Sequence, residues 1–167
     1  HATAEEYKFA TTPYYAALID PNNPECPLRL QTIPRFNEMK RAAADMRALA
    51  EHLSKAERPL AVVGGGGWSP EAAADFAEFA QAFQLPVAAS FRAQDIVDNN
   101  LPIYVGELGA ATDPALVKRA KAADLLIVVG ARLGEMTTQG YTIFTPPKAH
   151  APLVHVHPDS AELGRVY

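Results

Sequence analysis

The chain has 167 residues, of which 49% are apolar and 20% charged, and its formal net charge is −4. These values are typical of one globular domain that buries its core without disulfides or structural metals. The acidic balance, with no basic patch, argues against a nucleic-acid surface. Because no stretch is long enough to span a membrane and no signal peptide opens the chain, we expect a cytoplasmic protein.

Residues 1–36 are predicted to form an arm or linker from a preceding domain, because prolines interrupt any helical or alternating period. The lone cysteine, Cys26, lies in this stretch with no base beside it, which indicates an inert thiol. A domain over residues 37–167 is predicted to follow. It begins with a helix that ends near residue 56, because apolar residues recur there at steps of three and four: Met39, Ala43, Met46, Ala50 and Leu53.

A buried strand is predicted at residues 60–63, followed by four glycines, Gly64 to Gly67. A helix then begins, since Ser69 is a good N-cap and Pro70 suits the first helical position. We expect the buried face of this helix to consist of Ala72, Phe76, Phe79, Ala80 and Phe83.

Further strands are predicted at residues 86–90, 103–105, 125–130 and 153–157. Helices are predicted at residues 115–122, with Leu116, Val117 and Ala120 facing inward, and at residues 160–166. Strands that alternate with helices predict an α/β fold, a doubly wound and Rossmann-like parallel sheet of about six strands. Ligands of such sheets bind at the carboxyl ends of the strands. Three segments should share that edge: residues 64–67, 106–109 and 130–132.

Two interpretations of the glycine run remain open at this stage. Glycines between a strand and a helix bring backbone N–H groups close to a phosphate, but some are needed merely to close the turn. Arg132 has a similar ambiguity, because it can bind a phosphate at two points or form an ion pair with Glu135 or another surface carboxylate.

Other chemistry is weakly supported. The dinucleotide fingerprint fits only if Ser69 replaces its third glycine, and residues 88–90 lack the acidic residue expected for NAD. Ser90 and Arg92 leave an NADP site open. His155 and His157 share a strand face without a third ligand, which favours packing over metal binding. We therefore predict no catalytic residue and no metal ligand, and expect a binding or scaffolding domain.

Four segments, residues 57–66, 85–109, 123–133 and 154–165, together resemble the central domain of thiamine diphosphate (TPP)-dependent enzymes of the acetolactate synthase type. The resemblance covers about residues 37–166. It implies a homo-oligomeric parent enzyme whose N-terminal pyrimidine-binding and C-terminal diphosphate-binding domains hold TPP and Mg²⁺. The chain lacks the Gly-Asp-Gly motif that such enzymes use for the diphosphate, and no stretch matches their glutamate-bearing segment. The chain alone is therefore expected to be inactive.

The resemblance also implies a nucleotide at this domain, FAD in the acetolactate synthase branch and ADP or acyl-CoA in others. The matching cofactor-binding positions are Gly64, Gly65, Gly66, Gly109, Gly130, Ala131, Arg132 and Asp159. This sequence departs from the flavin-binding pattern at residues 110–111, at residues 133–135 and at His157. FAD and an ADP-like ligand both remain open.

The parent enzyme is thus expected to cleave or join a carbon–carbon bond of a 2-oxo acid, as a lyase or transferase. Three alternatives remain. The first is a stand-alone module that binds FAD, ADP or CoA, and the second is a sirtuin-like NAD-dependent enzyme. The third is a pure interaction domain, which would bind no small molecule.

Overall fold

The computed structural model describes residues 36–167, with side chains from Asp45 onward. The chain divides between Glu51 and His52 into two compact units, and each is considered by itself. Helix α4 (Phe36–Lys55) agrees with the predicted helix within one residue at each end. The predicted arm at residues 1–36 lies, apart from its last position, outside the described residues.

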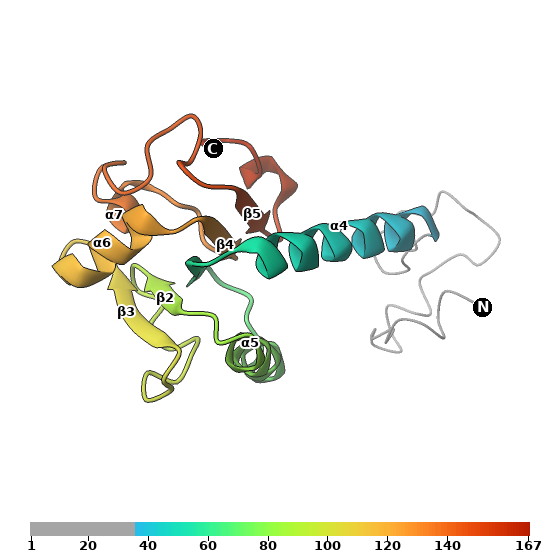
Figure 1. The fold of residues 1–167 in the computed structure, drawn as a ribbon, viewed down its shortest axis with the longest axis horizontal. Helices are drawn as coiled ribbons and strands as arrows, with labels where there is room; N and C mark the ends of the chain where they lie inside the picture. Colours follow the sequence, from blue (N-terminus) through green and yellow to red (C-terminus); the bar gives the residue numbers. More distant parts are fainter. Residues whose placement is uncertain (1–35) are drawn as a thin grey trace, which may run out of the picture. The chain divides into compact units, whose positions relative to one another are not determined.

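Five strands form one wholly parallel sheet in the second unit, in the order β3-β2-β1-β4-β5 (Figure 1). This order confirms the doubly wound, Rossmann-like class. The described residues contain one strand fewer than the predicted number of about six. The strands are β1 (Pro59–Val63), β2 (Val87–Ser90), β3 (Tyr104–Leu108), β4 (Leu125–Val129) and β5 (Leu153–Val156).

Helix α5 (Pro70–Ala82) joins β1 to β2, and α6 (Pro114–Ala122) joins β3 to β4. Both begin as predicted or one residue earlier, and the Ser69 hydroxyl accepts from the Ala72 N–H at 3.1 Å. Parallel crossovers are right-handed, so these two connections place their helices on opposite faces of the sheet. Figure 1 shows α6 beside β3.

Two short helical segments differ from the prediction. The four-residue helix α7 (Glu135–Thr138) lies between β4 and β5, where none was expected. The predicted closing helix at residues 160–166 is wrong, because only a 3-10 turn, η1 (Ser160–Glu162), forms there. Leu163 is extended and Gly164 has a φ of +73°, so the chain cannot continue as a right-handed helix.

The core forms where alternate residues of the central strands face one helix or the other. Leu60 and Val62 of β1 pack in the same cluster as Leu116 and Ala120 of α6, and all four side chains are buried. The predicted inward positions of α6 are thereby confirmed for Leu116 and Ala120. Val117 is partly buried and packs against the same cluster.

The predicted buried face of α5 is largely wrong. Only Ala80 is fully buried, and Phe83 is 58% exposed. The phenylalanine rings instead pack on one another along the helix, because residues three or four apart are neighbours on its surface, and Trp68, which precedes the helix, packs on Phe76. Ring centroids lie 5.8 Å apart for Trp68–Phe76, 6.2 Å for Phe76–Phe79 and 5.0 Å for Phe79–Phe83.

Asp124 fixes the starts of β1 and β4 relative to each other. Its carboxylate accepts from the backbone N–H of Glu57 at 3.0 Å and of Arg58 at 2.9 Å. Burial opposes ionisation of this carboxyl, but the two N–H donors and the charge of Arg58 outweigh it and hold the pKa below its usual value. The first residues of the two strands, Pro59 and Leu125, are paired, and so are the last, Val63 and Val129. The turns that follow the strands therefore lie side by side.

Candidate functional site

The turns after β1 and β4 touch through their backbones. A Cβ atom on Gly65, whose φ is +74°, would lie 2.1 Å from the carbonyl oxygen of Gly130. A Cβ on Gly130 would lie 2.3 Å from the carbonyl oxygen of Gly64. That same carbonyl accepts a hydrogen bond from the Trp68 indole at 2.9 Å. A Cβ on Gly64 would lie 1.9 Å from the Ser90 hydroxyl oxygen and 2.9 Å from the Ala131 Cβ. Packing and conformation thus explain the glycines at positions 64, 65 and 130.

Gly66 has no such explanation within the described residues. A Cβ placed on it would meet no heavy atom within 4 Å, and its φ lies outside the left-handed region. The backbone is also exposed to solvent at this position. The lack of a side chain here leaves bare backbone that another molecule can approach closely. We call residues 64–67 and 130–132 the glycine rim.

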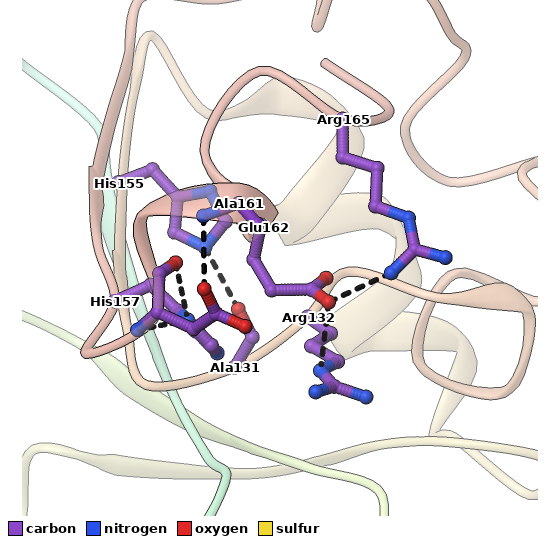
Figure 2. Close-up of polar contacts among 8 residues, drawn as sticks. Ala131, Arg132, His155, His157, Ala161, Glu162 and Arg165 are labelled. Atoms are coloured by element: carbon purple, nitrogen blue, oxygen red, sulfur yellow. Dashed lines mark hydrogen bonds and ion pairs between the residues drawn. The ribbon is translucent and has the colours of Figure 1, made fainter.

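Arg132 ends the glycine rim, and its side chain is 68% exposed. Its Nε lies 3.4 Å from Oε1 of Glu162, which also accepts from Nη1 of Arg165 at 2.7 Å. Figure 2 shows Glu162 between the two arginines. The ion pair foreseen as one interpretation of Arg132 therefore exists, with Glu162 as the partner in place of Glu135.

His155 lies in β5, and His157 follows directly after the strand, which ends one residue before the predicted position 157. Both rings contact the backbone around the site. Nε2 of His155 lies 2.8 Å from the carbonyl oxygen of Ala131, which precedes Arg132. Nδ1 of His157 accepts from the Asp159 N–H at 3.1 Å. The rings contact edge to face at 5.9 Å. Among the side chains described from Asp45 onward, no three of His, Cys, Asp or Glu are grouped to hold a metal.

A cavity of about 200 Å³ opens beside Arg132, and it is lined by both arginines, Glu162, His155, Tyr141 and Tyr167 among others. The Tyr167 hydroxyl donates to the Phe144 carbonyl at 2.7 Å, and burial raises the pKa of this phenol. Tyr141 has a φ of +62°, which is rare for a bulky residue.

The structure brings together most but not all of the predicted cofactor-binding positions. Gly64, Gly65, Gly130 and Ala131 lie in contact, and the exposed Gly66 and Arg132 flank them. Gly109 lies at the end of β3, two strands from β1, where its N–H donates to the Thr112 hydroxyl at 2.7 Å. The Asp159 carboxylate caps η1 by accepting from the Ala161 N–H at 2.9 Å. Gly106 lies within β3 and not at its end.

Four polar residues that line the cavity were not predicted as site residues: Tyr141, Glu162, Arg165 and Tyr167. Arg132 and Glu162 are 30 residues apart, and no local spacing pairs them. A signal did exist in Glu162 and Arg165, which have the i,i+3 spacing of opposite charges on one helical turn.

A larger hollow of about 700 Å³ lies elsewhere, near the amino ends of β1 and β2. Its basic residues are Arg58, Lys118 and Arg119, and the Arg58 Nε donates to the Ala122 carbonyl at 3.0 Å. We place the candidate site at the smaller cavity, because ligands of open parallel sheets bind at the carboxyl ends of the strands.

No helix of the described residues is both long and apolar enough to cross a membrane. Residues 46–167 match the family model of the central domain of thiamine pyrophosphate enzymes. The chain is 31% identical over 130 residues to the large subunit of acetolactate synthase isozyme 2 from Escherichia coli (strain K12), covering 78% of this chain and 23% of that protein.

Two other relatives carry different names. Sulfoacetaldehyde acetyltransferase of Rhodobacter capsulatus is 31% identical over 138 residues, covering 80% of this chain and 23% of that protein. The 3D-(3,5/4)-trihydroxycyclohexane-1,2-dione hydrolase of Geobacillus thermodenitrificans is 29% identical over 113 residues, covering 68% of this chain and 18% of that protein. The chain thus matches less than a quarter of the length of each of these relatives.

The different roles of the glycines can be tested by substitution. We expect Gly66→Ala to change the free energy of unfolding by less than about 0.5 kcal/mol, since its Cβ meets open space. Gly65→Ala should cost at least about 2 kcal/mol, because it combines a left-handed φ with a backbone clash. Urea unfolding of both variants measures the difference, and equal losses of stability would contradict the assignment.

Proposed function

Because the chain belongs to the family of thiamine pyrophosphate enzyme central domains, we propose that it serves an enzyme of the acetolactate synthase type that acts on 2-oxo acids. The match to an acetolactate synthase large subunit supports this choice of substrate class. The matches to an acetyltransferase and a hydrolase show that this kind of central domain occurs in proteins named for different reactions. The range of reactions open to the parent enzyme is correspondingly wide.

In this proposal the reaction belongs to the whole protein. A pyrimidine-binding and a diphosphate-binding domain hold TPP and Mg²⁺, and TPP supplies stabilisation of a carbanion next to the substrate carbonyl. No residue of this chain is assigned to TPP, to Mg²⁺ or to a chemical step, and the chain alone is inactive. Its part is to space the two catalytic domains, to contribute to subunit packing in a homo-oligomer and to hold a nucleotide.

The nucleotide role is carried by the bare backbone at Gly66. A phosphate can approach the N–H groups there without meeting a side chain, four residues before the 13-residue helix α5 begins at Pro70. Arg132 follows the contact between the two turns, and among the side chains described from Asp45 onward only Glu162 engages it, at Nε. Its terminal nitrogens are left to bind an anion at two points. These groups fit the diphosphate of FAD or ADP.

The reaction can be tested on the full-length protein. We expect it to consume a 2-oxo acid such as pyruvate only when TPP and Mg²⁺ are present, and we expect the fragment of residues 37–167 to consume none. The measurement is loss of the 2-oxo acid with and without each cofactor. Turnover by the fragment, or by the full-length protein without TPP, would contradict the proposal.

Nucleotide binding is tested separately by thermal or chemical unfolding. ADP or FAD at 100 times its Kd should add about 2.7 kcal/mol to the free energy of unfolding. Arg132→Ala should weaken binding by about tenfold or more, because it removes charge-assisted hydrogen bonds to phosphate. Arg119→Ala, in the hollow near the amino ends of the strands, is the matched control and should bind normally.

The nucleotide role would be abandoned on either of two results. One is that neither ADP, FAD nor CoA stabilises the protein at any concentration tested. The other is that Arg119→Ala reduces the affinity as much as Arg132→Ala does, which would place binding away from the glycine rim.

A further inference from the structure

We propose that Glu162 binds the ribose hydroxyls of the nucleotide and makes the site selective for a ribonucleotide diphosphate over its deoxy analogues. This inference rests on the nucleotide role proposed above and names what the cavity beside the glycine rim recognises.

The two oxygens of the Glu162 carboxylate have different surroundings. Oε1 is held by both guanidinium groups, at 3.4 Å from Arg132 Nε and 2.7 Å from Arg165 Nη1. No hydrogen bond within the described part of the chain reaches Oε2, and because no buried side-chain oxygen there lacks a partner, Oε2 is open to solvent. The Glu162 side chain is 10% exposed and lines the cavity. An ionised carboxylate oxygen only accepts hydrogen bonds, so Oε2 is an open acceptor.

The neighbouring guanidinium groups offer the opposite chemistry. Their side chains are 68% and 64% exposed for Arg132 and Arg165, and each uses a single nitrogen to contact Glu162. The remaining N–H groups of both arginines are free to donate, and both side chains line the same cavity as Glu162. A phosphate alone satisfies the donors and is repelled by Oε2. A phosphorylated sugar satisfies both, because its hydroxyls donate to the carboxylate while its phosphate accepts from an arginine.

The size of the cavity matches one part of a nucleotide. Its volume of about 200 Å³ lies below the roughly 300–1,000 Å³ of pockets that enclose whole ligands. The cavity can therefore hold a sugar or a single ring, while the rest of the ligand lies outside it.

Arg132 belongs to both the cavity and the glycine rim. The Gly65 and Gly130 backbones touch, and Arg132 follows Gly130 by two residues, a chain distance of at most about 7 Å. In the proposal, a diphosphate on the exposed backbone at Gly66 extends its ribose toward Arg132 and Glu162.

Glu162 is held in place before any ligand arrives. Its N–H donates to the Asp159 carbonyl at 3.1 Å, and its own carbonyl accepts from the Arg165 N–H at 3.3 Å. The Asp159 carboxylate caps the same turn. Because the turn and the two arginines fix the carboxylate, a hydroxyl that reaches Oε2 replaces water without the cost of ordering a loose side chain.

Calorimetric titration of the full-length protein with ADP and with 2′,3′-dideoxy-ADP tests the role of Glu162. The natural protein should bind ADP about tenfold more tightly, a difference of about 1.4 kcal/mol. In Glu162→Ala the ratio of the two affinities should fall to near one, and Glu162→Gln, which keeps one acceptor oxygen, should restore part of it. Glu135→Gln, an exposed glutamate outside the cavity, is the control and should leave the ratio unchanged.

Each contrary result identifies what has failed. Equal binding of the two nucleotides by the natural protein would overturn the ribose role and leave nucleotide binding intact. Binding of neither would overturn both proposals. If Glu162 served only to neutralise the arginines, Glu162→Ala would change both affinities by one factor and keep their ratio, which would also overturn the ribose role.

Discussion

The backbone contact between the turns after β1 and β4 determines how the carboxyl edge of the sheet is built. These strands are paired along their whole length, so their following turns emerge side by side. The turns can touch only because Gly64, Gly65 and Gly130 carry no Cβ. A methyl group at position 65 or 130 would overlap a carbonyl oxygen and separate the turns.

The site combines backbone groups that hydrogen-bond within the protein with backbone groups that are exposed to solvent. The carbonyl of Gly64 is satisfied by Trp68, and the carbonyl of Ala131 is contacted by His155. The backbone at Gly66, in contrast, is covered by no side chain. The Glu162 carboxylate shows the same division, with Oε1 held by two arginines and Oε2 without a hydrogen bond to the described part of the chain. Groups already fixed by the fold can bind a ligand at little ordering cost.

Local signals predicted most of the fold. The Ser69 cap, the uniformly apolar β4 and the pairing of strands with helices each depend on residues near one another in sequence. Of the site, the glycine turns were predicted, because glycines that directly follow an apolar strand can be recognised in the sequence. The side chains that line the cavity, apart from Arg132, were not predicted. Glu162 could not be paired with Arg132 from sequence, since the contact exists only after β5 has been added beside β4. Phe83 was misplaced because helical spacing cannot tell a ring that packs on the sheet from one that packs on Phe79.

Nucleotide binding at the glycine rim and the adjoining cavity should be visible by hydrogen exchange of the full-length protein with and without saturating ADP, because exchange reports every segment at once. We expect ADP to slow exchange at residues 64–69, 130–134 and 155–165. Protection confined to the hollow near Arg58, Lys118 and Arg119, or no protection in this domain, would show that the nucleotide does not bind at the glycine rim.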